Sequence, residues 1–210
     1  MNNLQSFSLG ILAAIGALFL EVLLLNFSEP LSFIGKEKVA KEFISLDFFF
    51  FSAILIEELL KYFLISKFLL KEKNFVFSSF FLGLGFSLFE LILIYWNYKI
   101  GIEFEISGIM GVILIHITTS VIIAYSIWKN IGKKLLAFLG GFIPAIIIHS
   151  LYNIASVVET RYQNKIIFAL LIFLAFLTSF LLIKSTVSKD LKTIWKTLAF
   201  YRSLFYTKIN

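Results

Sequence analysis

Cysteine is absent from the 210 residues, and proline and histidine each occur only twice. Without cysteine there is no disulfide framework, no thiolate nucleophile and no cysteine-based metal site. Charged residues are also scarce, at 15% of the chain, whereas a typical soluble domain carries about a quarter. The few ionisable groups that fall inside apolar segments therefore become the candidates for function.

Hydrophobic residues make up 60% of the chain, and the mean hydropathy is +0.94. Several apolar runs reach the roughly 20 residues that a helix needs to cross hydrocarbon. The composition predicts an all-α, polytopic transmembrane helix bundle, with residues 1–210 as a single transmembrane domain. The net charge of +6 is not a sign of nucleic-acid binding, because basic residues in membrane proteins first report orientation. We expect the lipid bilayer as a partner and no nucleic acid.

Six helices are expected, separated by short turns, by a mixed-charge loop over 28–46 and followed by a basic tail over 185–210. Their expected ranges are 7–27, 47–70, 75–96, 107–128, 135–157 and 165–183. An even number of spans puts both termini on one side, and that side holds most of the Lys and Arg residues. The positive-inside rule then places both termini in the cytoplasm of a multi-pass protein, which we expect in a prokaryotic plasma membrane.

Two carboxylates and an ammonium stand in the middle of the second apolar run, in Glu57-Glu58-Leu59-Leu60-Lys61. A charge at the centre of a membrane helix costs roughly 3 kcal/mol and usually faces a polar interior. At this spacing the lysine can reach either carboxylate, at i, i+4 from Glu57 or i, i+3 from Glu58. One alternative is a structural ion pair that locks helix packing. Such a pair needs only one carboxylate, so we interpret the stretch as a functional site.

Four ionisable residues fall at a similar depth on different helices. Counted at about 1.5 Å per residue from the outer helix ends, their depths are roughly 10–15 Å. They are Glu57, Glu90, His116 and His149. A shared layer indicates one buried polar chamber that opens outward, since snorkelling residues would cluster at helix ends. Glu21 lies near this layer, and we interpret it as snorkelling to the interface.

Smaller features surround this layer. Gly83 and Gly85 would let the third helix approach a neighbour closely. Pro144 removes a backbone hydrogen bond and predicts a bend one turn before His149. Asn153 lies one turn after His149, on the same helix face.

These groups are compatible with two mechanisms of hydrolysis. In the first, Glu57 acts as general base on a water that attacks a peptide carbonyl, and His149 and Asn153 hold the oxyanion. We choose Glu57 over its neighbour because it shares a face with Lys61. In the second, two histidines and a glutamate bind a divalent metal such as zinc. No His-Glu-x-x-His motif supports the second way.

Four short motifs follow one another on successive expected helices. They are Glu57-Glu58-x-x-Lys61, Phe86-x-x-x-Glu90, His116 and His149-x-x-x-Asn153. Together they resemble the motifs of the PrsW family of intramembrane proteases, over roughly residues 50–155. The Glu-Glu and His-x-x-x-Asn motifs are also similar to those of CAAX prenyl endopeptidases and bacteriocin-processing or immunity proteins, which belong to the same superfamily.

The resemblance implies an intramembrane endopeptidase whose partner is a membrane-embedded or membrane-proximal protein or peptide substrate. It implies catalytic roles for Glu57, Glu58, Glu90, His116, His149 and Asn153, with Lys61 and Phe86 in support. The family has been classed both as metal-dependent and as glutamate-type. Because the Glu-Glu pair is the strongest feature, we favour the glutamate type with no cofactor. A zinc ion held by Glu90, His116 and His149 is the other reading.

Three other functions are compatible with buried ionisable residues. An ion-coupled transporter would have polar residues along the whole depth of the bundle and often inverted repeats, and neither is evident. A haem protein would use His116 and His149 as axial ligands, which an absorption spectrum would reveal. A non-catalytic scaffold or immunity protein would keep the same polar layer without cleaving a substrate.

Overall fold

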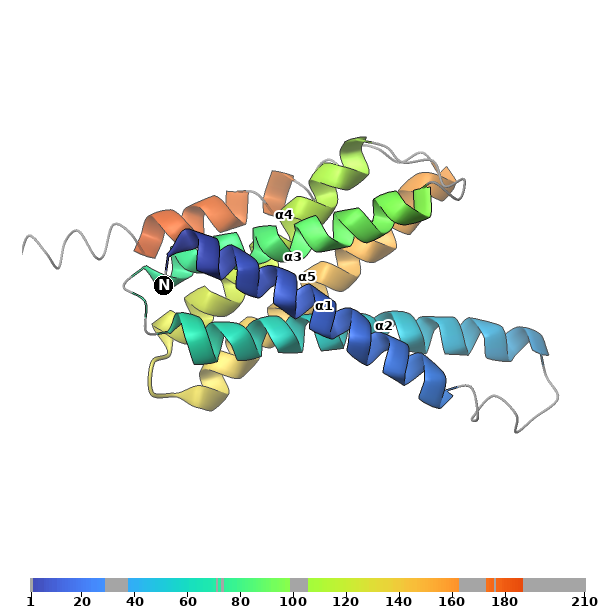
Figure 1. The fold of residues 1–210 in the computed structure, drawn as a ribbon, viewed down its shortest axis with the longest axis horizontal. Coiled ribbons are helices and arrows are strands. Elements are labelled where there is room, and N and C mark those ends of the chain that lie inside the picture. Colours follow the sequence, from blue (N-terminus) through green and yellow to red (C-terminus); the bar gives the residue numbers. More distant parts are fainter. Residues whose placement is uncertain are drawn as a thin grey trace, which may run out of the picture.

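Apolar runs account for the helices of the computed structural model, which describes residues 2–28, 38–70, 72, 74–98, 106–162, 173–175 and 177–186. The elements are α1 (Asn3–Ser28), α2 (Lys38–Leu64), a π-helix (Ile65–Leu69), α3 (Phe75–Tyr98), α4 (Ile106–Lys129), α5 (Lys134–Tyr162) and a final helix over Phe173–Thr186 (Figure 1). The described residues contain no strand, so the predicted all-α bundle is confirmed.

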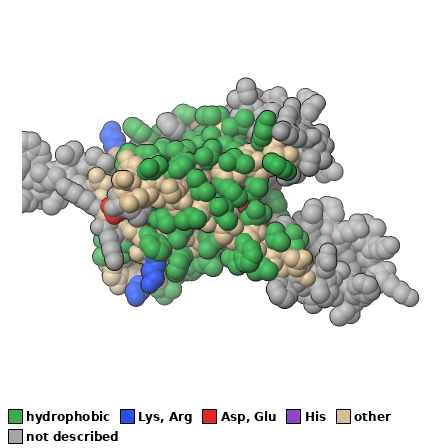
Figure 2. All heavy atoms as spheres, in the orientation of Figure 1, with side chains coloured by type: hydrophobic (Ala, Val, Ile, Leu, Met, Phe, Trp, Pro, Cys, Tyr) green, Lys and Arg blue, Asp and Glu red, His purple; other side chains and the backbone are tan. Residues whose placement is uncertain are grey.

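Four of these helices are long and apolar enough to cross a membrane. They span Asn3–Asn26, Phe75–Trp96, Gly108–Lys129 and Lys134–Ser156. Hydrophobic side chains cover most of the described surface in Figure 2, with Lys and Arg at one end of the bundle. The chain is therefore a multi-pass membrane protein. The cytoplasmic placement of the termini stays a prediction, and the tail beyond residue 186 lies outside the described residues.

Two predicted boundaries were wrong. The segment 38–46 was expected in a loop but forms the start of α2, and α5 runs on to Tyr162 rather than ending near 157. Hydropathy marks only the hydrocarbon-spanning part of a helix, while the backbone hydrogen bonds continue into the interfacial region. The second helix also changes to a π-helix at Ile65, which no feature of its composition predicts. Most of the expected turn before the fourth helix, residues 99–105, and the start of the expected sixth helix, residues 165–172, lie outside the described residues.

Glycines hold α3 in close contact with the helices on either side of it. A Cβ on Gly83 would lie 2.5 Å from the carbonyl oxygen of His116, so the backbones of α3 and α4 touch there. On the α1 side, a Cβ on Gly85 would overlap the carbonyl oxygen of Phe7, and one on Gly10 would overlap that of Leu82. The predicted close approach at Gly83 and Gly85 is confirmed. This contact matters because Gly83 packs directly against the backbone of His116, one of the two histidines.

One continuous apolar cluster, here called the apolar core, fills the bundle on one side of the histidine layer. Its buried members are Ile65, Leu69, Phe75, Val76, Leu82, Ile117, Val121, Ile123, Ala124, Ile127, Ala137 and Ala145. Along α2 and α4 these residues follow the charged positions, and along α3 and α5 they precede them. Because neighbouring helices run in opposite directions, this order places the core on one side of the layer. Pro144 lies inside α5.

Candidate active site

Lys61 is the centre of the buried polar group. Its ammonium nitrogen lies 2.7 Å from Glu58 Oε1, 2.7 Å from His116 Nδ1 and 3.2 Å from Thr119 Oγ1. An ammonium group has three N–H donors and no acceptor, so all three hydrogens are used and Nδ1 of His116 accepts. Lys61 is fully buried, and its charge is balanced by the Glu58 carboxylate on the same helix face.

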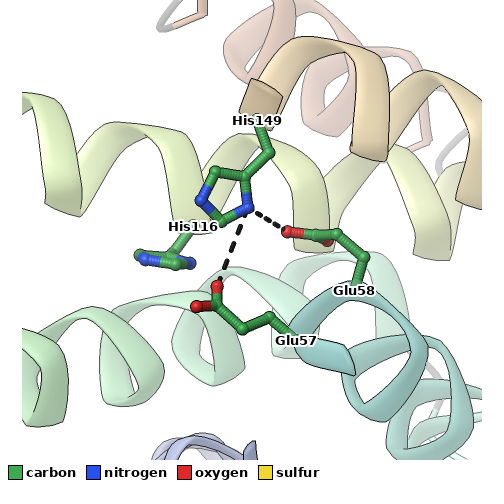
Figure 3. A group of neighbouring side chains, drawn as sticks. All are labelled: Glu57, Glu58, His116 and His149. Carbon is green, nitrogen blue, oxygen red and sulfur yellow. Dashed lines mark hydrogen bonds and ion pairs between the residues drawn. The ribbon is translucent and has the colours of Figure 1, made fainter. Parts of the chain in front are cut away.

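Glu58 links Lys61 to the second histidine. Its Oε1 also lies 2.7 Å from Nδ1 of His149, which therefore donates a hydrogen bond to the carboxylate (Figure 3). Glu58 is fully buried, and a buried charge is stable only when it is paired and hydrogen-bonded. One carboxylate oxygen thus joins α2 to α5, while the lysine joins α2 to α4.

His116 is held on both of its ring nitrogens. Nδ1 accepts from Lys61, and Nε2 contacts Oε2 of Glu90 on α3, so Nε2 carries the hydrogen. The ring of Phe86 lies 4.7 Å from the His116 ring and 4.4 Å below the Lys61 ammonium. The attraction between the ammonium and the aromatic face stabilises Lys61 in addition to its ion pair with Glu58. Helices α2, α3 and α4 together fix the orientation of this imidazole.

Glu57 differs from its neighbour. Its Oε2 lies 3.7 Å from His149 Nδ1 and is buried without a hydrogen-bond partner among the described residues. The side chain of Glu57 is 16% exposed, compared with 0% for Glu58. Glu58 Oε2 is also buried and unpaired, but the other oxygen of that carboxylate already has two partners. Within the described part of the chain, Glu57 is thus the carboxylate of the pair that makes no side-chain hydrogen bond, although it lies close to His149.

Most predicted site residues come together in space. We call Glu57, Glu58, Lys61, Glu90, His116 and His149 the polar cluster. Lys61 forms its ion pair with Glu58, so sharing a face with Glu57 was the wrong reason for preferring that residue. Asn153 is half-buried one turn beyond His149, and its side chain has no hydrogen bond within the described part of the chain.

Sequence reasoning missed Thr119. Its hydroxyl accepts from Lys61 and donates to the carbonyl of His116, one turn before it. The signal was present, because Thr119 lies at i+3 from His116 and therefore on the same face of the helix. Glu21, expected to reach the membrane interface, lies on α1 and is half-buried.

The chain matches the family model described as PrsW family intramembrane metalloprotease over residues 3–183. It belongs to the PrsW family. Intramembrane proteolysis is therefore the general activity to which the polar cluster has to be related. Searches of curated proteins and of solved structures each return no match.

The family description implies a metal ion, and the donor atoms permit a test of the fit. Ligand atoms of Glu57, Glu58, His116 and His149 lie within 4.8 Å of one another, and such oxygens and nitrogens are the types that zinc prefers. Glu90, expected as a ligand, lies outside this group. Both nitrogens of His116 are engaged, however, and Glu58 Oε1 is shared between Lys61 and His149. By type these residues match a metal site, but as arranged they do not fit one.

Proposed function

We propose that this chain is a glutamate-type intramembrane endopeptidase of a prokaryotic plasma membrane. It hydrolyses a peptide bond of a membrane-embedded or membrane-proximal protein, with Glu57 as general base. The observation that carries this proposal is the contrast within the glutamate pair. Glu58 is neutralised by Lys61 and hydrogen-bonded to His149, whereas the buried Oε2 of Glu57 has no hydrogen-bond partner among the described residues.

In the proposed reaction, Glu57 takes a proton from a water molecule whose oxygen attacks the substrate carbonyl carbon. The carbonyl oxygen then becomes an oxyanion, which needs donors already in place. His149 and the Asn153 amide, one turn further along α5, are the groups that hold this oxyanion in the proposed reaction. Glu57 finally gives its proton to the leaving amine nitrogen as the carbon–nitrogen bond breaks.

The remaining members of the polar cluster position these groups. Lys61 and Glu90 hold the two nitrogens of His116, whose ring meets that of His149 edge to face at 5.1 Å between centroids. The two imidazoles therefore support each other's orientation. A base held at fixed distance from a bound water contributes typically about 100- to 10,000-fold to a rate.

The test is cleavage of a panel of membrane-anchored reporter peptides by purified protein in lipid vesicles. Glu57→Gln keeps the shape of the side chain but removes the base, so we expect a loss of about 100-fold or more. Glu72→Gln makes the same chemical change in the turn before α3 and serves as the matched control, with activity like that of the wild type. Full activity in Glu57→Gln would disprove the role of Glu57.

A chelator arm separates the two chemistries that the family allows. Activity that survives chelation supports the glutamate type, and activity that is lost and then restored by zinc supports the metal-dependent type. If no peptide is cleaved while ion flux through the vesicles depends on Glu57, the ion-coupled transporter is favoured. If neither activity is present, the scaffold or immunity role is favoured.

A further inference from the structure

We propose that Lys61 is the built-in cation of this site and that its presence excludes a divalent metal from the polar cluster. Metal binding by these residues and the three contacts of Lys61 are then mutually exclusive. This inference deepens the proposed function, on which it rests for what the site does, but its test does not depend on proteolysis.

The Lys61 ammonium already occupies two atoms that could bind a metal ion. The Lys61 ammonium lies 2.7 Å from Glu58 Oε1 and 2.7 Å from His116 Nδ1, and both atoms belong to residues that a metal would use. A zinc ion binds such atoms at about 2.0–2.2 Å and needs their lone pairs. Those lone pairs accept hydrogen bonds from the lysine instead. A metal ion that used these two atoms could bind only after the ammonium had left both of them.

Both ring nitrogens of His116 already have partners. Its Nε2 contacts Glu90 while its Nδ1 accepts from Lys61. Rotation of the ring by half a turn about Cβ–Cγ would place carbon atoms where the two nitrogens now lie, so both contacts would be lost. A metal would therefore have to displace either the ammonium or the Glu90 carboxylate from this imidazole.

The surroundings of Lys61 hold its side chain in place. It is fully buried, its ammonium packs on the Phe86 ring, and its third hydrogen is held by Thr119. Glu58 lies three residues earlier on the same helix, so the pair stays together however α2 moves as a body. A buried charge that loses its partner is strongly destabilising. The arrangement retains the lysine and repels a second cation.

Cobalt(II) titration of the purified protein tests this directly, because bound Co²⁺ absorbs visible light with an intensity that reports its geometry. Lys61→Met removes the charge and keeps an unbranched side chain, and Lys61→Arg keeps the charge. Removing one positive charge a few ångströms from a divalent ion should tighten binding about 100-fold or more. We expect tight binding in Lys61→Met, lost when His149→Ala is added, and weak binding in the wild type and in Lys61→Arg.

Two results would overturn the inference. One is a stoichiometric Co²⁺ spectrum in the wild type that disappears in His149→Ala, and the other is a folded Lys61→Met that binds no tighter than the wild type. Gel filtration in detergent checks folding, and Lys61→Gln replaces Lys61→Met if the latter aggregates. If neither variant folds, the wild-type titration decides alone.

The cleavage assay remains independent of this titration. A wild type that binds Co²⁺ at the cluster while Glu57→Gln is inactive would refute the exclusion of metal and leave hydrolysis standing. A wild type that excludes Co²⁺ while Glu57→Gln remains active would support the exclusion of metal and refute the role of Glu57 in hydrolysis.

Discussion

The polar cluster and the apolar core are built from the same helices but are held together in different ways. On α4 they meet at consecutive residues, because His116 is bonded to Lys61 and Glu90, while Ile117 is buried in the core. In the core, side chains meet by shape alone, and a neighbouring lipid tail is as apolar as they are. In the cluster, each contact requires a particular atom on a particular helix. The cluster thus sets how the helices align, and the core fills the space that results.

The largest effect on stability should come from breaking the ion pair. Glu58→Ala leaves the Lys61 ammonium buried without its carboxylate and removes the partner of His149. Losing one member of a buried pair costs about 3–5 kcal/mol. Unfolding in mixed micelles would measure this loss. Leu59→Ala, the next residue and half-exposed, is the control, and equal losses in the two variants would contradict the comparison.

Leu82→Ala should have a smaller effect on the apolar core. Leu82 is fully buried on α3, and deleting a buried leucine side chain typically costs about 2–5 kcal/mol, which we expect to fall at the lower end here. Cleavage per folded molecule should be unchanged, because no atom of the polar cluster is lost. The control is Leu88→Ala, on the same helix but 42% exposed. A selective loss of cleavage would show that core and cluster are coupled.

The smallest effect should come from the hydroxyl at the edge of the cluster. Thr119→Val is nearly isosteric and removes one of the three acceptors of Lys61, which should cost about 1 kcal/mol. Thermal unfolding would detect this change. Thr178→Val is its control, since the Thr178 hydroxyl donates to a carbonyl of its own helix, that of Leu174. A loss as large as that of Glu58→Ala would mean that the hydroxyl, and not the carboxylate, holds the lysine.

The contrast between the polar cluster and the apolar core also explains which features could be predicted from the sequence. Isolated charges in apolar runs are conspicuous, so Glu57, Glu58, His116 and His149 could be selected before any contact was known. Helix count followed from apolar length in the same way. These features depend on residue type and position along a helix, both of which are visible in a sequence.

Pairing was not predictable, because it depends on how far each helix is rotated. Both carboxylates lie within reach of Lys61 along α2, and only the positions of His116 and His149 on other helices select Glu58. The start of α2 at Lys38 was missed because its first turns are too polar to be read as a membrane span. Thr119 was missed because a threonine in a membrane helix usually bonds its own backbone.

The pair of Glu58 and Lys61 bears on how the protein is made. Both charges lie on one helix at i, i+3, so their ion pair forms without any other helix. We therefore expect α2 to enter the bilayer with these two charges already neutralising each other, before α4 and α5 have been synthesised. The histidines join later, when their helices dock on a polar surface that is already in place. The order of synthesis thus protects the most costly residues of the site from exposure to lipid.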